Sequence, residues 1–331
     1  MPERYRAVPS TAARLGAPQP TRIESSDPIV PWHGRSESDS AIRRPSQRRE
    51  LEEGRHRMPT QPPPHIDRDV RYSDQHDALV LDVHRPGPGS PASTGAVVLV
   101  HGGGWFRGDK SKEDVLSARL VDAGYTVFVP NYRMAPTDVF PASRDDVLTA
   151  HEWALQSDIS FDRSKVAFFG GSAGGNLAVE GGIATGRPSV SWSGIFGLAE
   201  IIRATDGTVS AAPTTQDLDA MRSSDIDQTG RDDPFLRWVI LQEVGGDRSA
   251  LAAASTIGHV TASTGPVYLA NSLDEWVPRS DPIALQAALA AVGVPNTLQL
   301  IPGLRHAEGY TDHALPGSLT FLAQTLGVEH R

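Results

Sequence analysis

Residues 166–178 read VAFFGGSAGGNLA. Four apolar residues that suit a buried strand lead into Gly170-Gly171-Ser172-Ala173-Gly174, and a helix-forming run follows. This is a G-x-S-x-G sequence between a strand and a helix, a context that holds the serine in a sharp, strained turn. The neighbours must be small, because larger side chains would collide with the adjoining strand or helix. The stretch predicts Ser172 as a nucleophile, with its oxygen near the positive end of the helix dipole.

The chain on either side alternates short apolar runs with amphipathic runs from about residue 72 onward. Such alternation predicts an α/β fold with a mostly parallel central sheet and helices on both faces. The 331 residues are compatible with one large domain of this kind. We expect strands at 78–83, 96–100, 126–130, 166–169, 190–196, 267–270 and 297–301, and helices at 112–123, 144–156, 173–184, 281–292 and 318–326.

Two segments depart from the alternation. Residues 1–64 are rich in Pro, Ser and Arg and show no helical or strand period, so we expect a disordered tail before a domain at 65–331. Met58 also offers an alternative translation start. Residues 198–257 are polar and irregular around one apolar patch, and an insertion of this size is typical of a lid. We expect it to be a small cap over the site.

A second glycine-rich turn lies upstream of Ser172. His101-Gly102-Gly103-Gly104-Trp105 ends the apolar run of residues 97–100. Successive glycines let backbone N–H groups turn into a cavity, where they can stabilise the oxyanion of acyl transfer. The expected oxyanion hole consists of the N–H groups of Gly103, Gly104 and Ala173. His101 is expected to brace this loop, because a base before the serine is in the wrong order for such a fold.

A serine nucleophile needs a histidine base, and that base needs a carboxylate. Asp274 and His306 each follow a predicted strand, in the required order serine, acid, histidine. Glu275 stands beside Asp274 as an alternative acid. Asp281 is a further alternative, although a helix N-cap before a proline explains it. His313 is the alternative base, and a surface position explains it.

Composition excludes several other functions. The net charge of −9 argues against a nucleic-acid partner, and the absence of cysteine excludes disulfides and a thiol nucleophile. No metal motif, dinucleotide fingerprint or P-loop occurs, so we expect no metal and no cofactor. No signal-peptide core and no run of about 18 apolar residues is present, so we expect a cytoplasmic protein without a membrane span. The sequence leaves the oligomeric state open.

Three segments carry a resemblance to a known family. HGGGWFRGDK (101–110), NYRMAPTDVFPASRDDV (131–147) and GSAGGNLA (171–178) resemble hormone-sensitive-lipase-like and feruloyl-esterase-like carboxylesterases of the α/β-hydrolase superfamily, over residues 72–328. The resemblance implies an α/β-hydrolase fold with a catalytic triad of Ser172, Asp274 and His306. It departs from the lipase-like pattern at Gly171, where that branch has Asp. The acid also lies in a D-x-x-V-P string instead of D-P-L-x-D.

We therefore expect a serine hydrolase that cleaves a small or medium carboxylic ester through an acyl-enzyme. An amide or formamide substrate requires the same residues and remains an alternative. Similar proteins also include dehydratases or cyclases of specialised metabolism that reuse the triad for proton transfer. A binding protein that has lost catalysis would show a broken triad, whereas all three residue types are present here.

Overall fold

The computed structural model describes residues 63–204 and 233–328. The expected disordered tail at 1–64 lies outside these ranges except for its last two residues. The middle of the expected cap, 205–232, also lies outside them.

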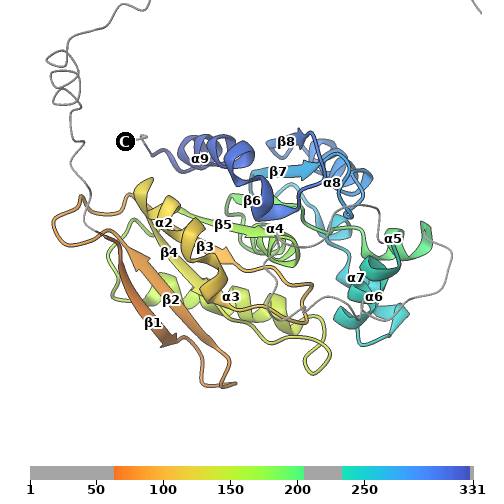
Figure 1. Ribbon diagram of the computed structural model, residues 1–331, viewed down its shortest axis with the longest axis horizontal. Coiled ribbons are helices and arrows are strands. Elements are labelled where there is room, and N and C mark those ends of the chain that lie inside the picture. Colours follow the sequence, from red (N-terminus) through yellow and green to blue (C-terminus); the bar gives the residue numbers. More distant parts are fainter. Residues whose placement is uncertain (1–62, 205–232, 329–331) are drawn as a thin grey trace, which may run out of the picture. The chain divides into compact units, whose positions relative to one another are not determined.

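The strands of the described residues form one eight-stranded sheet in the order β1-β2-β4-β3-β5-β6-β7-β8 (Figure 1). β1 and β2 run antiparallel to their neighbours, and the remaining pairs are parallel. This confirms the expected α/β class with a mostly parallel sheet. The strands are β1 (His65–Arg71), β2 (Val80–Arg85), β3 (Gly95–Val100), β4 (Tyr125–Pro130), β5 (Val166–Gly171), β6 (Ser189–Trp192), β7 (Val267–Ser272) and β8 (Asn296–Ile301).

Helices cover both faces of the sheet, because successive side chains of each strand point to opposite faces and both sets are apolar. Val97 and Leu99 of β3 belong to one apolar cluster together with residues of α2 and α9. Val98 and Val100 point the other way, into a cluster with residues of α3, α4 and α6. Both faces of β3 are apolar because both are buried. The helices are α2 (Asp114–Asp122), α3 (Ala142–Gln156), α4 (Ala173–Thr185), α5 (Leu198–Ala204), α6 (Asp233–Glu243), α7 (Leu251–Ala254), α8 (Ser280–Ala291) and α9 (Thr311–Leu326).

Three elements differ from the expectation for physical reasons. β1 reads HIDRDVR and is an edge strand stabilised by ion pairs, so it carries no apolar alternation. α9 begins seven residues before the expected start at 318 and contains Pro316, which sequence reasoning placed outside the helix. β6 ends at Trp192 instead of residue 196, and the loop that follows it contributes to the site described below.

The described helices include none that is both long enough and apolar enough to cross a membrane.

Candidate active site

Ser172 occupies the turn between β5 and α4. Its φ of +56° and ψ of −126° fall in a region that non-glycine residues rarely adopt, and its side chain is almost fully buried. A Cβ at Gly174 would overlap the carbonyl oxygens of Val100 and His101. The glycine therefore lets α4 pack directly on the end of β3. This close approach of helix and strand explains why the residues of the sequence motif are small.

His306 is hydrogen-bonded to Glu275 and not to Asp274. Nδ1 of His306 lies 2.5 Å from Oε2 of Glu275, and both side chains are fully buried. Asp274 is exposed to solvent at the surface of the same turn. The expected pairing of His306 with Asp274 is therefore wrong, and Glu275 takes that place. Adjacent residues of a tight turn point in different directions, and here it is Glu275 that points inward.

The Glu275 carboxylate is fixed by two further donors. Oε1 accepts the backbone N–H of Ser272 at 2.8 Å and the hydroxyl of Ser193 at 2.8 Å. Ser193 also accepts the N–H of Ala307 at 3.0 Å, so it joins the acid loop to the histidine loop. Sequence reasoning did not identify Ser193, because it assigned this position to a strand. Its φ of +52° instead places it in a turn after β6.

Nε2 of His306 is buried and makes no hydrogen bond with the described residues. Because Nδ1 faces a carboxylate, its proton lies on that side and Nε2 is left as a proton acceptor. The histidine loop lies against the serine turn, since a Cβ at Gly171 would come 3.0 Å from Cβ of Ala307. The ring of Trp276, which lines a pocket together with Ser172, is 5.0 Å from the ring of His306.

The alternative base and the further alternative acid lie elsewhere in the fold. His313 is exposed on α9. Asp281 is buried inside α8, whose N-cap is Arg279, so the N-cap explanation is also wrong. Its carboxylate accepts the backbone N–H groups of Phe196 and Gly197 at 2.7 and 2.8 Å. Asp281 thus braces the loop after β6, and burial raises its pKa to about 7.

The glycine loop after β3 lines the same pocket as Ser172. Gly103 and Gly104 have φ values of +127° and +63°, which glycine adopts without strain. His101 stacks on Tyr132 with ring centroids 4.3 Å apart, and the Tyr132 hydroxyl donates to the carbonyl oxygen of His101 at 3.0 Å. Burial lowers the pKa of His101 to about 4, so its ring is neutral near pH 7. These contacts agree with a bracing role for His101.

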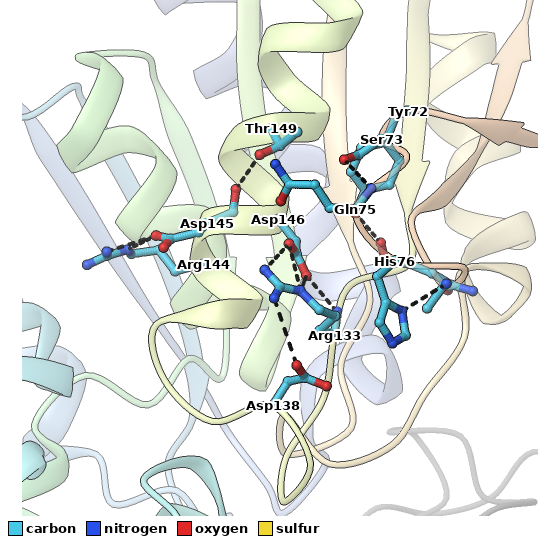
Figure 2. Close-up of polar contacts among 12 residues, drawn as sticks. Tyr72, Ser73, Gln75, His76, Arg133, Asp138, Arg144, Asp145, Asp146 and Thr149 are labelled. Atoms are coloured by element: carbon cyan, nitrogen blue, oxygen red, sulfur yellow. Dashed lines mark hydrogen bonds and ion pairs between the residues drawn. The ribbon is translucent and has the colours of Figure 1, made fainter.

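The second motif, at residues 131–147, is held together by an ion pair (Figure 2). Arg133 donates from Nη2 to Oδ1 of Asp146 at 2.7 Å and from Nε to Oδ2 at 2.9 Å. Its backbone N–H reaches the same carboxylate at 2.8 Å. Asn131, two residues earlier, accepts the N–H of Lys110 at 2.8 Å. The motif is therefore hydrogen-bonded to the loop that begins at His101, and residues 131–147 are absent from the lining of the pocket.

The pocket over Ser172 is walled partly by α6. Phe235 and Val239 of this helix face it together with Trp276 and Phe106. The Phe235 and Trp276 rings lie 5.4 Å apart. Arg107 and Lys112 complete the wall near the glycine loop.

A second acidic side chain lies beside the serine turn. A Cβ at Gly171 would overlap Oε1 of Glu308, so the carboxylate of Glu308 occupies the space next to Gly171. Glu113 is buried nearby, and burial together with the charge of Glu308 raises its pKa well above the usual value. Sequence reasoning missed Glu308, which is separated from Gly171 by the whole of β6 to β8.

One group of side chains has the composition of a metal site. Asp82, His84 and Asp114 bring ligand atoms within 4.8 Å of one another. Both carboxylates, however, are bound by Arg68, and Asp82 is also 2.9 Å from Nζ of Lys110. These cations already neutralise the group, which explains its charges without a metal.

Comparison with known proteins identifies related chains. The BD-FAE family model matches residues 81–289. Ethyl acetate hydrolase of Pseudomonas putida is 38% identical over 104 residues, which are 30% of this chain and 33% of the relative. Carboxylesterase NlhH of Mycobacterium tuberculosis is 29% identical over 226 residues, 66% of this chain and 67% of its own length. The chain thus spans only a third of the first of these relatives.

Solved structures share the fold. The hyperthermophilic esterase from the archaeon Pyrobaculum calidifontis superposes with a TM-score of 0.63 at 21% identity, covering 81% of this chain and 85% of its own. Esterase B from Lactobacillus rhamnosis gives 0.61 at 19% identity, with 84% and 91% coverage. At such identities the likeness extends to the α/β-hydrolase fold.

Proposed function

The chain belongs to the BD-FAE family of esterase-like α/β-hydrolases, and from that premise we propose that it hydrolyses carboxylic esters with Ser172 as the nucleophile. The observation that carries the proposal is the His306–Glu275 pair. It leaves Nε2 of a buried imidazole as the acceptor for a serine proton. The names of the curated relatives, an ethyl acetate hydrolase and a carboxylesterase, support the same chemistry.

The proposed reaction proceeds in two halves. Nε2 of His306 takes the hydroxyl proton of Ser172 as the oxygen attacks the ester carbonyl, and Glu275 stabilises the resulting imidazolium. The N–H groups of Gly103, Gly104 and Ala173 hold the negative oxygen of the tetrahedral intermediate. His306 then returns the proton to the leaving alcohol. Water attacks the acyl-enzyme by the same route and releases the acid.

The α6 side of the pocket is proposed as the cap that the sequence indicated. Phe235 and Val239 face the space above Ser172, where an acyl chain or an aromatic alcohol could rest. Their apolar surfaces exclude water from the reacting carbonyl and strengthen the electrostatic interactions there.

The test combines a covalent probe with model substrates. We expect wild-type protein to react with a fluorophosphonate and to hydrolyse p-nitrophenyl esters of short acyl chains. Ser172→Ala and His306→Ala should abolish both, whereas His313→Ala, which alters an exposed histidine, should retain them. Unlabelled wild-type protein would contradict an activated serine. Labelling without hydrolysis of any ester would favour an amide or a non-hydrolytic reaction.

A further inference from the structure

The end of β6 and the residue after it contact all three loops of the proposed triad. The carbonyl oxygen of Trp192 accepts the backbone N–H of Ser172 at 2.7 Å. The next residue, Ser193, is fully buried. Its hydroxyl oxygen lies 2.8 Å from Oε1 of Glu275 and 3.0 Å from the backbone nitrogen of Ala307 in the histidine loop. A segment of two residues therefore joins the nucleophile turn, the acid loop and the histidine loop.

A second buried hydroxyl group lies next to Ser193. Tyr310, the last residue before α9, is 1% exposed, and its phenolic oxygen is 2.7 Å from Oγ of Ser193. The same oxygen is 2.9 Å from the carbonyl oxygen of Ala270, which also accepts the backbone N–H of Ser193 at 2.8 Å. Burial and the charge of Glu275 raise the pKa of Tyr310 well above its usual value, so the phenol keeps its proton and can act as a donor.

The number of available protons decides the direction of these hydrogen bonds. Ser193 has one hydroxyl proton, and an ionised Glu275 carboxylate can only accept it. The lone pairs of the Ser193 oxygen are then free for two donors, the N–H of Ala307 and the hydroxyl of Tyr310. In the opposite direction Ser193 would donate to Tyr310, and Tyr310 to Ala270. The oxygens of Ser193 and Glu275 would then face each other at 2.8 Å without a proton between them. An ionised acid therefore selects donation from the phenol to the serine.

We propose that Tyr310 and Ser193 form a hydroxyl relay that positions the Glu275 carboxylate for catalysis. Tyr310 donates to Ser193, and Ser193 donates to Oε1 of Glu275. Oε2 of the same carboxylate is thereby held toward Nδ1 of His306, and its negative charge is stabilised while the imidazolium forms. Hydrogen bonds in a row polarise one another, so Tyr310 acts on the acid through Ser193. This inference rests on the proposed ester hydrolysis and adds two positioning residues to it.

Steady-state kinetics with p-nitrophenyl butyrate test the relay. Ser193→Ala should lower kcat by about 10- to 100-fold, because a hydrogen bond to a buried charge is lost. Tyr310→Phe keeps the aromatic ring and should lower kcat by about three- to tenfold. KM should change by less than about twofold, because neither residue lines the pocket over Ser172. Ser193→Gly also relieves the φ of +52° at this position, and it should lose as much activity as Ser193→Ala.

A double variant distinguishes a relay from two independent contacts. If Tyr310 acts through Ser193, adding Tyr310→Phe to Ser193→Ala should lower kcat by less than about twofold further. Two control variants remove hydroxyl groups of the same kind. The hydroxyl of Ser191, which is also buried in β6, makes no hydrogen bond with the described residues. The hydroxyl of Tyr268 donates to Gln299. Ser191→Ala and Tyr268→Phe should each keep kcat within about twofold of wild type.

A spectroscopic measurement reports on the acid without a substrate. The Nδ1 proton of His306 should give a far-downfield proton NMR resonance, which is identified by its absence in His306→Ala. Loss of the Ser193 donor leaves more negative charge on Oε2 of Glu275. The resonance should therefore move further downfield in Ser193→Ala, and by a smaller amount in Tyr310→Phe. It should keep its position in Ser191→Ala.

The outcomes separate the relay from the proposed function. An active enzyme whose kcat and NMR resonance are unchanged in Ser193→Ala would overturn the relay and leave the esterase intact. If the kinetic effects of the two substitutions multiply in the double variant, Tyr310 acts independently of Ser193, and the relay is also overturned. If wild-type protein cleaves no ester and binds no fluorophosphonate, the proposed function fails, whereas the shift of the His306 resonance still tests the hydrogen bonds of the relay.

Discussion

Nδ1 of His306 lies 2.5 Å from Oε2 of Glu275, whereas Asp274, the preceding residue, faces solvent. The carboxylate is held by the backbone of Ser272 and by the hydroxyl of Ser193 as well as by the histidine. A carboxylate fixed by three donors in a fully buried position can orient an imidazole and stabilise its charge. An exposed carboxylate on the outside of the turn cannot.

Glu275→Gln should lower kcat for p-nitrophenyl butyrate by about 10³- to 10⁴-fold, because the amide cannot stabilise the imidazolium and favours the wrong tautomer. Asp274→Asn is the matched control and should stay within about twofold of wild type, because a surface substitution changes little. Steady-state kinetics of the two variants decide between the acids. A large loss in Asp274→Asn with an active Glu275→Gln would reverse the assignment.

Gly171→Ala should destabilise the protein by about 1–3 kcal/mol, because the added methyl overlaps the Glu308 carboxylate and crowds Ala307. Adding Glu308→Ala removes the overlap. Urea denaturation of the double-mutant cycle should then show a favourable coupling of about 1 kcal/mol or more. Gly258→Ala, where a Cβ meets nothing within 4 Å, serves as the control. Strictly additive effects would show that the two residues do not compete for space.

Asp146→Ala should lower the free energy of unfolding by about 2–4 kcal/mol, because it leaves Arg133 without the carboxylate that binds its side chain and its backbone. The neighbouring pair offers a comparison on the same helix (Figure 2). Asp145 is half exposed beside Arg144 at 2.8 Å, and Asp145→Ala should cost less than about 1 kcal/mol. Chemical denaturation measures both. Equal losses of stability in the two variants would mean that burial of the Asp146–Arg133 ion pair does not contribute to stability.

Glu243, at the end of α6, should make stability depend on pH. It is buried, accepts the Ser143 hydroxyl at 3.1 Å, and burial raises its pKa from 4.5 to about 8. Between these values the unfolded chain releases the proton while the folded chain keeps it. Its stabilising contribution is therefore complete below pH 4.5, falls as pH rises, and is lost near pH 8.

Glu243→Gln should remove this dependence, so the free energy of unfolding should fall less between pH 5 and about 8 in the variant than in wild type. Glu152→Gln, on the exposed side of α3, should keep the wild-type slope. Denaturation at several pH values measures both slopes. Parallel slopes for wild type and Glu243→Gln would contradict the raised pKa.

Local sequence pattern was sufficient for most of the fold. The apolar runs that became β3, β4, β5 and β7 are strands buried on both faces of the sheet, so the residues of both faces are apolar and the run is easily recognised. β1 escaped detection because its stability comes from ion pairs such as Arg68 with Asp82, which join residues 14 positions apart. A polar edge strand shows no alternation of apolar and polar residues by which its sequence could be recognised.

Sequence pattern alone identifies the turn at Ser172, the glycine loop at His101–Gly104 and the order in which serine, acid and histidine follow their strands. These features are local, because they depend on small residues and on the place where each strand ends. The choice of Glu275 over Asp274 is made by the packing of the folded chain, which also brings Ser193 to Glu275 and Glu308 to Gly171. These contacts join residues that are 31 to more than 130 positions apart in the sequence, and they depend on the direction in which each side chain points. A local sequence pattern contains no information about such directions.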